Sequence, residues 1–384
     1  MASSFGNNIK IQIFGQSHSL KLGVVVDGLP AGFEIDMKRV QRALDRRRGG
    51  QNAYSTPRAE ADVPLIVSGL VKGETCGAPL TALFDNSNVR SKDYDHLKNI
   101  PRPSHADYYA GSKFCDFNDA RGGGHFSGRM TLPLVFAGAV CAQILEEAWN
   151  VSIGAHIDQI YHVVDKPFDP LNVSKDDLSF DAFPVNDPGV EEAMKQAMLD
   201  AAAEGDSVGG VIECAAIGLE VGLGSPMFEG VENRLSQAIF AIPAVRGIEF
   251  GAGFDAAGML GSEHNDPFCL AKVEYDDDDC DDDFDLSEDD DFDSFDDFEP
   301  AHKSNHAGGV VGGLTTGAPL IFRVAFKPTP SIAKEQDSVN LEILKEVKLK
   351  IGGRHDPCIV PRAVPVVEAV TAIVLADMLF RDDV

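Results

Sequence analysis

Residues 121–149 read RGGGHFSGRMTLPLVFAGAVCAQILEEAW, a glycine-rich segment that leads directly into a long apolar run. Glycine adopts left-handed backbone conformations without steric cost, so the glycine-rich part predicts a tight turn. The apolar part predicts a buried helix over residues 131–148, because the uncharged run of 16 residues at 130–145 is short for a membrane span. A helix that follows such a turn presents backbone N–H groups that suit an anion.

Short runs rich in Ile and Val alternate with helical patterns on both sides of this segment. The sequence predicts strands over residues 9–14, 22–26, 151–162, 208–220, 247–250 and 320–327. It predicts helices over residues 36–48, 191–203, 231–242 and 364–379, of which the first begins at Asp36 and ends in the triplet Arg46, Arg47, Arg48. This mixture predicts one α+β domain over residues 1–384, with room for two similar halves.

The charge of the chain limits its partners. The 384 residues carry a formal net charge of -28, and a negative field of this size repels nucleic acids. Any anionic ligand must therefore be bound by local clusters of arginine. Seven cysteines without a CxxC pair favour a reducing compartment, and the first ten residues, MASSFGNNIK, resemble no targeting signal. We therefore expect a cytoplasmic protein without a membrane partner.

An acidic segment interrupts the second half of the chain. Residues 276–299 contain 16 acidic residues out of 24, which is more than half of the net charge. Such a density of like charge cannot bury enough apolar surface to fold, so we expect a disordered surface insert. Binding of a cation or of a basic partner is the alternative, although the segment lacks the glycine of a calcium loop.

Four short clusters combine histidine, arginine, glycine and serine in predicted turns, where a ligand can approach closely. They are GQSHS at residues 15–19, RPSHAD at 102–107, RGGGHFSGR at 121–129 and GRHDPC at 353–358. Histidine exchanges protons near neutral pH, and guanidinium groups match phosphate and carboxylate oxygens, so the clusters predict an anion site with acid–base chemistry. The alternatives are histidines that only cap strand ends and arginines that pair with surface carboxylates.

Signatures of several other enzyme classes are absent from the sequence. It has no GxxxxGK[ST], no GxGxxG after a strand, no HExxH and no GxSxG, which excludes P-loop, classical dinucleotide-binding, zinc-protease and hydrolase sites. No metal site is predicted. The segment KPTPS at residues 327–331 either binds a phosphate through Lys327, Thr329 and Ser331 or is an ordinary strand exit.

Six motifs in a fixed order resemble the signature segments of the chorismate synthase family, over residues 9–380. They are RSKDY at residues 90–94, RPSHADY at 102–108, GDSVGG at 205–210, SNHAGG at 304–309, KPTPSI at 327–332, and GRHDPC at 353–358 with RAVPVVEA at 362–369. The resemblance implies a β-α-β sandwich of two pseudo-symmetric halves that pack helices between sheets, and a homotetramer. It also implies a reduced-FMN-dependent 1,4-anti elimination of phosphate from 5-enolpyruvylshikimate 3-phosphate, which gives chorismate.

The resemblance also assigns roles to single residues. His18 resembles the acid that protonates the departing phosphate, and His105 resembles the residue that protonates reduced flavin, with Ser17 and Ser127 relaying to it. Asp356 resembles the carboxylate that assists removal of the ring proton. The positions implied to bind FMN are His125, Phe126, Ser127, Ala244, Gly312, Lys327, Pro328, Thr329, Pro330, Ser331 and Arg354. Those implied to bind substrate, or NADPH as a candidate flavin reductant, are Arg47, Arg48 and Arg129.

Some positions depart from the family pattern. The first motif is GQSHS where GESHG is usual, so Gln16 and Ser19 replace a carboxylate and a glycine, and His125 and Phe126 stand where Arg and Ser are frequent. Ala53 occupies a position where an arginine in some members is linked to NADPH-dependent flavin reduction. Two other functions stay open on this basis: a catalytically weak relative that binds FMN or a shikimate-pathway metabolite without turnover, and a flavin oxidoreductase.

Overall fold

The structure is a computed structural model that describes residues 3–56, 58, 60–87, 99–180, 183–272, 298–352 and 355–380. The motif RSKDY, Arg354 and residues 276–297 of the acidic segment lie outside these ranges. The last two residues of that segment, Phe298 and Glu299, begin strand β13 (Phe298–His302), which pairs with β12 (Phe268–Lys272). The expectation of disorder is therefore wrong for these two residues, because a strand partner binds their backbone.

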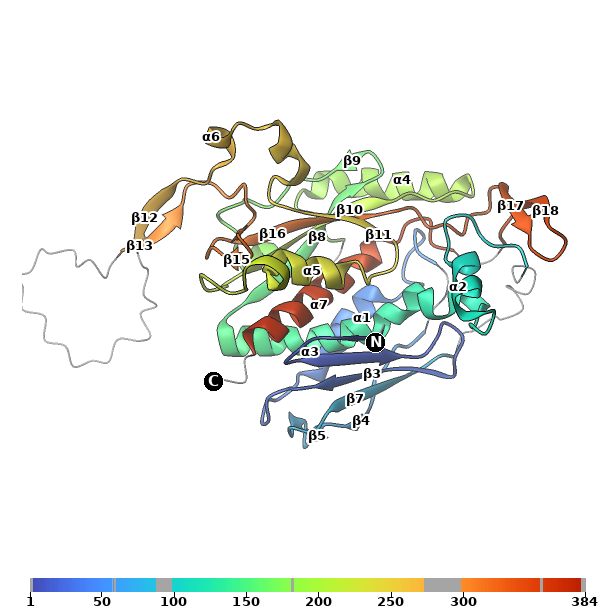
Figure 1. Cartoon of the computed structure of the whole chain (residues 1–384), viewed down its shortest axis with the longest axis horizontal. Helices are drawn as coiled ribbons and strands as arrows, with labels where there is room; N and C mark the ends of the chain where they lie inside the picture. The colour runs from blue at the N-terminus through green and yellow to red at the C-terminus, as the bar shows by residue number, and fades with distance from the viewer. Residues whose placement is uncertain are drawn as a thin grey trace, which may run out of the picture.

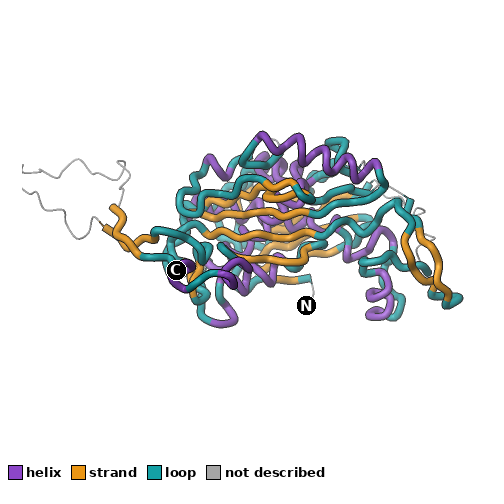
Figure 2. The backbone as a smooth tube through the Cα atoms, turned by 90° about the horizontal axis from the view of Figure 1, so that it is seen from above, coloured by secondary structure: helices purple, strands orange, loops and turns teal. Residues whose placement is uncertain are grey.

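Two five-stranded antiparallel sheets enclose a layer of helices (Figure 1). The first sheet has the order β1 (Ser4–Phe5), β2 (Lys10–Phe14), β3 (Lys21–Asp27), β7 (Leu80–Asp85) and β4 (Leu65–Ser68). The second has the order β11 (Val245–Phe250), β16 (Leu320–Phe326), β10 (Gly210–Ile217), β8 (Ser152–Ile160) and β9 (Val163–Val164), and Figure 2 shows its strands side by side.

Four helices fill the space between the sheets, as Figure 1 shows. They are α1 (Met37–Arg47), α3 (Thr131–Trp149), α5 (Val231–Ile239) and α7 (Val360–Leu379). A further helix, α4 (Glu191–Ala203), lies on the outer side of the second sheet and contacts β8. The predicted α+β sandwich is therefore confirmed.

The two halves of the chain repeat one order of elements: two paired strands, a helix, an edge strand, a small hairpin, a central strand and a long helix. In the first half these are β2, β3, α1, β4, β5–β6 (Leu70–Val71 and Glu74–Thr75), β7 and α3. In the second half they are β8, β10, α5, β11, β14–β15 (Val310–Val311 and Leu314–Thr315), β16 and α7. The strand orders β2-β3-β7-β4 and β8-β10-β16-β11 correspond position by position, so the halves are pseudo-symmetric.

Thr75 and Thr315 hold equivalent places in the two halves. The hydroxyl of Thr75 accepts from the backbone N–H of Phe33, and the hydroxyl of Thr315 accepts from the backbone N–H of Leu223, each over 2.9 Å. Each threonine shortly precedes the tetrapeptide Gly-Ala-Pro-Leu, at residues 77–80 and 317–320, which leads into β7 or β16, the strand next to the edge strand β4 or β11. The internal repeat thus extends to single hydrogen bonds.

Helices α3 and α7 cross closely at the centre of the molecule. A Cβ atom on Gly138 of α3 would lie 2.3 Å from the Cα and Cβ atoms of Ala369 of α7, so only glycine permits this approach. Residues Gly128–Trp149 are long and apolar enough to cross a membrane, but 83% of that window is buried inside the protein. The segment is therefore the buried core helix that the sequence predicted.

Helix α1 begins and ends where the sequence predicted. Oδ1 of Asp36 accepts from the backbone N–H groups of Lys38, over 2.7 Å, and of Arg39, over 3.2 Å. These hydrogen bonds lower the pKa of Asp36, although desolvation opposes the shift. The helix ends at Arg47, and Gly50 adopts a left-handed φ of 79°. The other predicted helices and strands are also confirmed, with ends displaced by a few residues.

Candidate active site

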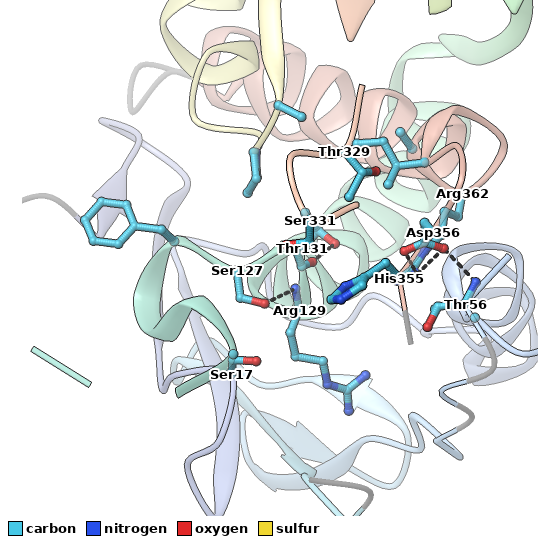
Figure 3. A pocket seen from close by; sticks show the side chains of 18 of the residues that line it. Ser17, Thr56, Ser127, Arg129, Thr131, Thr329, Ser331, His355, Asp356 and Arg362 are labelled. Atoms are coloured by element: carbon cyan, nitrogen blue, oxygen red, sulfur yellow. Dashed lines mark hydrogen bonds and ion pairs between the residues drawn. The ribbon is translucent and has the colours of Figure 1, made fainter. Parts of the chain in front are cut away.

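A cavity of about 460 Å³ lies where corresponding segments of the two halves meet (Figure 3). From the first half it is lined by residues at the end of α1 and the start of α3. From the second half it is lined by residues that follow α5, by residues that follow β16 and by the start of α7. Its volume falls in the range of small-molecule sites, about 300–1,000 Å³.

Both long helices begin at the cavity. Thr131 lines it from the first turn of α3, and Arg362 and Ala363 line it from the first turn of α7. The N-terminus of a helix carries about half a positive charge because its first N–H groups have no partner within the helix. Two such ends at one cavity favour a negatively charged ligand.

The charged side chains of the cavity are predominantly cationic, although the chain as a whole carries a net charge of -28. Among the described lining residues the cations are Arg47, Arg48, Arg58, Arg102, Arg129, Lys327 and Arg362. The carboxylates are Glu60, Asp62 and Asp356. This excess of positive charge, at one place in an acidic protein, is the local cluster that an anionic ligand requires.

Two buried carboxylates orient two of the arginines. Arg129 donates from Nη1 to Asp62 over 2.6 Å and from Nη2 to Glu60 over 3.2 Å. Arg47 donates from Nη2 to the other oxygen of Asp62 over 3.1 Å. All four side chains are buried, and a buried charge is costly unless it is paired. The pairs therefore fix the guanidinium groups at the cavity wall.

Arg47 is the most deeply buried of these cations. Burial lowers the pKa of Arg47 to about 9, an effect that Asp62 partly offsets and that Arg362 and Arg129 reinforce. The group is still a cation near neutral pH. Its buried Nε has no hydrogen-bond partner within the described part of the chain, and an unsatisfied buried polar group costs about 1–3 kcal/mol. A negatively charged ligand nearby would therefore stabilise Arg47 as a cation.

Asn86 connects the turn at residues 15–19 to the arginines. Its Nδ2 donates to the carbonyl oxygen of Ser17 over 2.8 Å and of Ser19 over 3.0 Å, while its Oδ1 accepts from Nε of Arg129 over 3.2 Å. The hydroxyl of Ser19 closes the same turn by accepting from the backbone N–H of Gln16 over 3.0 Å. The two residues that depart from the family motif thus bond to each other.

The glycine-rich turn packs against both candidate histidines. A Cβ atom on Gly122 would lie 2.7 Å from Nε2 of His18 and from Oγ of Ser17, and one on Gly123 would lie 3.2 Å from Nε2 of His105. The two glycines have left-handed φ angles of 63° and 97°. Glycine is required here both for the backbone conformation and for the close approach of the imidazole rings.

His105 lies in contact with Arg102 and Asp107. Nδ1 of His105 lies 2.7 Å from Oδ1 of Asp107, and Arg102 donates to the same carboxylate from Nε and from Nη2, each over 2.7 Å. Burial would raise the pKa of Asp107, but the hydrogen bonds from Arg102 and His105 outweigh it and lower that pKa well below its usual range. Asp107 is therefore an anion that holds the ring of His105.

Asp356 lies at the start of α7 with its carboxylate held from two directions, as Figure 3 shows. Its Oδ1 accepts from the backbone N–H of Thr56 over 2.8 Å, and its Oδ2 accepts from Nη1 of Arg362 over 3.0 Å. Both partners also line the cavity. The carboxylate is thus positioned at the wall by groups from both halves of the chain.

The remaining wall combines apolar side chains with the KPTPS segment. Lys327 donates to the hydroxyl of Ser104 over 3.1 Å, and Ser331 accepts from Nη1 of Arg102 over 3.1 Å. Burial, together with Arg246, lowers the pKa of Lys327. The hydroxyl of Thr329 is buried, and none of the residues that the structure describes bonds to it. The apolar lining residues are Ala106, Phe126, Ile242, Pro243, Ala244, Phe326, Pro330, Ile359, Ala363 and Val366.

Comparison with known proteins agrees with this geometry. A family model described as chorismate synthase matches residues 9–380. Relatives named chorismate synthase are 41% identical in Korarchaeum cryptofilum and 41% identical in Thermococcus kodakarensis, each over 98% of this chain and 97% of the relative. The chain belongs to the chorismate synthase family. A solved structure, titled Crystal Structure of Chorismate Synthase, has a TM-score of 0.71 at 26% identity and covers 98% of this chain and 92% of that chain.

Chorismate synthases are lyases, and most of the residues that the family resemblance singled out meet at the cavity. The lining includes Ser17, Arg47, Arg48, His105, Phe126, Ser127, Arg129, Ala244, Lys327, Thr329, Pro330, Ser331 and Asp356. His18 follows Ser17 and is buried beside Gly122. The chemical roles of these residues stay predictions.

A few of the predicted positions lie elsewhere in the chorismate synthase fold. His125 is exposed and contacts Ser3 and the carbonyl oxygen of Gly15. Gly312 lies in the turn between β14 and β15. Neither of these residues lines the cavity, and neither does Pro328. Arg354 is not among the described residues.

Several residues that build the site lie outside the motifs or had no role assigned from them. They are Thr56, Arg58, Glu60, Asp62, Asn86 and Asp107 as a partner of His105. A signal for most of them is present in residues 56–62, which read TPRAEAD and place charged residues at every second position just before the apolar run VPLIV. Charged residues at such spacing often stay in solvent, so only the fold shows that these are buried.

Proposed function

We propose that this chain converts 5-enolpyruvylshikimate 3-phosphate to chorismate. In this 1,4-anti elimination the bond from a ring carbon to the phosphate oxygen breaks, a proton leaves another ring carbon, and a new double bond forms. The observation that carries the proposal is the cationic cavity, which gathers six of the described arginines with His105 and Asp356. Membership in the chorismate synthase family supports the same reaction.

The cations of the cavity match the anions of this reaction. The substrate carries a phosphate and two carboxylates, and guanidinium groups bind such oxygens in a bidentate manner. Arg47, Arg48 and Arg129 are the proposed ligands of these groups. Their carboxylate partners hold them before the substrate arrives, which reduces the reorganisation needed on binding. The two helix N-termini add to the stabilisation of the departing phosphate.

We also propose that the cofactor is reduced FMN, because the residues present fit this group. The apolar side chains around Ala244 suit a flat ring system, and the unpartnered hydroxyl of Thr329 and the ammonium of Lys327 suit a phosphate or ribityl oxygen. The proposed FMN-binding residues in the lining are Phe126, Ser127, Ala244, Lys327, Thr329, Pro330 and Ser331. Reduced flavin would supply the electron-rich chemistry that assists the elimination, with no net change in its oxidation state.

The proton transfers are assigned to three side chains. His18, buried beside the glycine-rich turn, is the proposed acid for the departing phosphate. His105 is the proposed proton donor on the cofactor side of the cavity, with Ser17 and Ser127 as relays. Asp356, whose carboxylate is held by Thr56 and Arg362, is the proposed partner in removal of the ring proton. NADPH as flavin reductant, a homotetramer and a cytoplasmic location complete the proposal.

An anaerobic assay tests this function. Purified protein is mixed with chemically reduced FMN and 5-enolpyruvylshikimate 3-phosphate, and phosphate, chorismate and the flavin spectrum are recorded. We expect one phosphate per chorismate, with the flavin still reduced at the end. Tight binding of FMN without phosphate release would instead identify a binding protein. Consumption of NADPH in proportion to product would identify an oxidoreductase.

A further inference from the structure

His105 and Asp107 are two residues apart in the chain, at the N-terminal end of α2 (Asp107–Phe114). Nδ1 of His105 lies 2.7 Å from Oδ1 of Asp107. A carboxylate in its ionised form only accepts hydrogen bonds, so a contact of this length requires a proton on Nδ1. Nε2 of the neutral ring can then take up a proton, and the resulting imidazolium donates it toward the cavity, as the proposed proton donor must.

The ionised form of Asp107 is enforced by Arg102. Its backbone N–H donates to Oδ2 of Asp107 over 3.0 Å, and its guanidinium donates to both oxygens of the same carboxylate. Nη2 of Arg102 also lies 3.2 Å from Nδ1 of His105, and a hydrogen bond donated there would require the other tautomer. The contact with Asp107 favours the Nδ1–H form, because an ionised carboxylate oxygen 2.7 Å from a nitrogen lone pair would be repulsive.

The second ring nitrogen faces the glycine-rich turn and the cavity. Nε2 of His105 approaches the position of a Cβ on Gly123 to 3.2 Å, and His105 itself lines the cavity. The other charged and titratable groups of this region are His18, which packs against the same glycine-rich turn, and Lys327, whose ammonium donates to the hydroxyl of Ser104. Neither is bonded to His105, so Asp107 and Arg102 are the charged neighbours in contact with its ring among the residues described.

We propose that Asp107 is a positioning residue that fixes His105 in the Nδ1–H tautomer, with Nε2 directed at the reacting groups. The inference deepens the proposed function and rests on it for its catalytic meaning. Arg102 links this arrangement to the cofactor segment, because its Nη1 donates to Ser331 over 3.1 Å. A carboxylate that orients a catalytic histidine and stabilises its protonated form has the same chemical role in hydrolases.

The test reads the tautomer directly. Histidine labelled with 15N at both ring nitrogens is incorporated into the protein, and His105 is assigned among the ten histidines by loss of its signals in His105→Gln. Above the pH at which the ring loses its charge, we expect Nδ1 to carry the proton in the native protein. In Asp107→Asn the amide NH2 can donate to Nδ1, so we expect the proton to move to Nε2. A native Nε2–H tautomer, or an unchanged tautomer in Asp107→Asn, overturns the proposal.

Measurements of turnover provide a second, independent test. Asp107→Asn should lower turnover by about 10²- to 10⁴-fold with little change in KM, since it disturbs proton transfer rather than binding. In a His105→Ala background the same change should cost less than about twofold, because Asp107 acts through His105. An equal loss in both backgrounds would show a structural role and overturn the proposal. Asp107→Glu, which keeps the carboxylate, should recover part of the activity.

A matched control variant is available on an exposed hairpin, and the outcome for this proposal can be separated from the outcome for the proposed function. Asp337→Asn removes a carboxylate that pairs with Lys348 on an exposed hairpin and should leave both the His105 tautomer and turnover unchanged. The tautomer measurement needs no substrate. If the native protein makes no chorismate but shows the Nδ1–H form that moves in Asp107→Asn, the proposed function fails and the positioning contact stands. If the native protein makes chorismate but His105 carries its proton on Nε2, the proposed function stands and the positioning role of Asp107 fails.

Discussion

The guanidinium of Arg129 donates to the carboxylate of Asp62 over 2.6 Å, within the wall of the cavity. The same carboxylate accepts from Arg47, so one buried anion orients two of the proposed substrate ligands. Asp62 also has a left-handed φ of 53°, a conformation that Asp and Asn tolerate better than most residues. Asp62 therefore both tolerates the left-handed backbone conformation and neutralises two buried arginines.

Asp62→Asn should destabilise the protein strongly. The variant keeps the side-chain size and tolerates the backbone conformation, but it leaves two buried cations short of a counter-charge. We expect the free energy of unfolding to fall by about 3–5 kcal/mol, measured by urea denaturation. Asp85→Asn, which removes an exposed partner of Lys21, should change it by less than about 1 kcal/mol. Equal effects in the two variants would contradict the buried pair.

His18→Ala and His105→Ala should each lower turnover by about 10²- to 10⁴-fold, because each removes a proposed proton donor. Circular dichroism and the affinity for reduced FMN should change little. His162→Ala, at an exposed position outside the cavity, serves as the control and should keep the native rate. Native rates in both test variants would refute the assignment of the two histidines.

The stability of the protein should fall between neutral and alkaline pH because of His156. This ring is fully buried, with Nδ1 2.9 Å from Asp165 and Nε2 2.8 Å from Glu213. Burial lowers the pKa of His156, but hydrogen bonds to the two carboxylates outweigh it and raise that pKa to about 9. A histidine with a raised pKa contributes its stability fully below about pH 6.5 and loses it as the pH passes about 9.

The measurement compares the native protein with His156→Gln by urea denaturation at pH values from 6 to 10. The difference in unfolding free energy should be largest at pH 6 and should shrink by an amount on the order of 3 kcal/mol by pH 10. A difference that stays constant over this range would mean that His156 is neutral in the folded protein.

Gly138→Ala should lower the free energy of unfolding by about 1–3 kcal/mol through overpacking at the crossing of α3 and α7. The added Cβ would meet backbone as well as side-chain atoms of Ala369, which cannot move independently of its helix. Gly261→Ala, in α6 (Gly261–His264), adds the same atom to open space and should stay within about 0.5 kcal/mol of the native value. Similar losses in both variants would argue against a tight crossing.

The regular elements could be predicted from local patterns. Asp36 as a cap, the arginine triplet at the end of α1 and the apolar run of α3 are signals that neighbouring residues carry by themselves. The pairing of strands across the two halves is not local. The Gly-Ala-Pro-Leu repeat at residues 77–80 and 317–320 marks equivalent strands, but so short a repeat is recognisable only when the strand order is known.

The chemical identity of the site was predictable, but its supports were not. His18, His105 and the arginines stand in recognisable motifs, whereas Glu60 and Asp62 look like ordinary surface carboxylates in the sequence. Their burial depends on contacts with Arg129, which is more than sixty residues away along the chain. A pattern of spacing within a short segment carries no information about such distant partners.

The equivalence of Thr75 and Thr315 bears on how such a chain can arise. Two copies of one half, related by a twofold axis, would each have a shorter helix, like α1 or α5, and a long helix, like α3 or α7. The end of the shorter helix and the start of the long helix of both copies would meet at that axis. The present cavity lies between the segments that follow α1 and α5 and those that open α3 and α7, which are corresponding segments of the two halves. A duplicated and fused ancestor would therefore have one shared pocket rather than one in each half. After fusion, each side of that pocket could diverge separately, so that acids and bases came to face each other across an originally symmetric space.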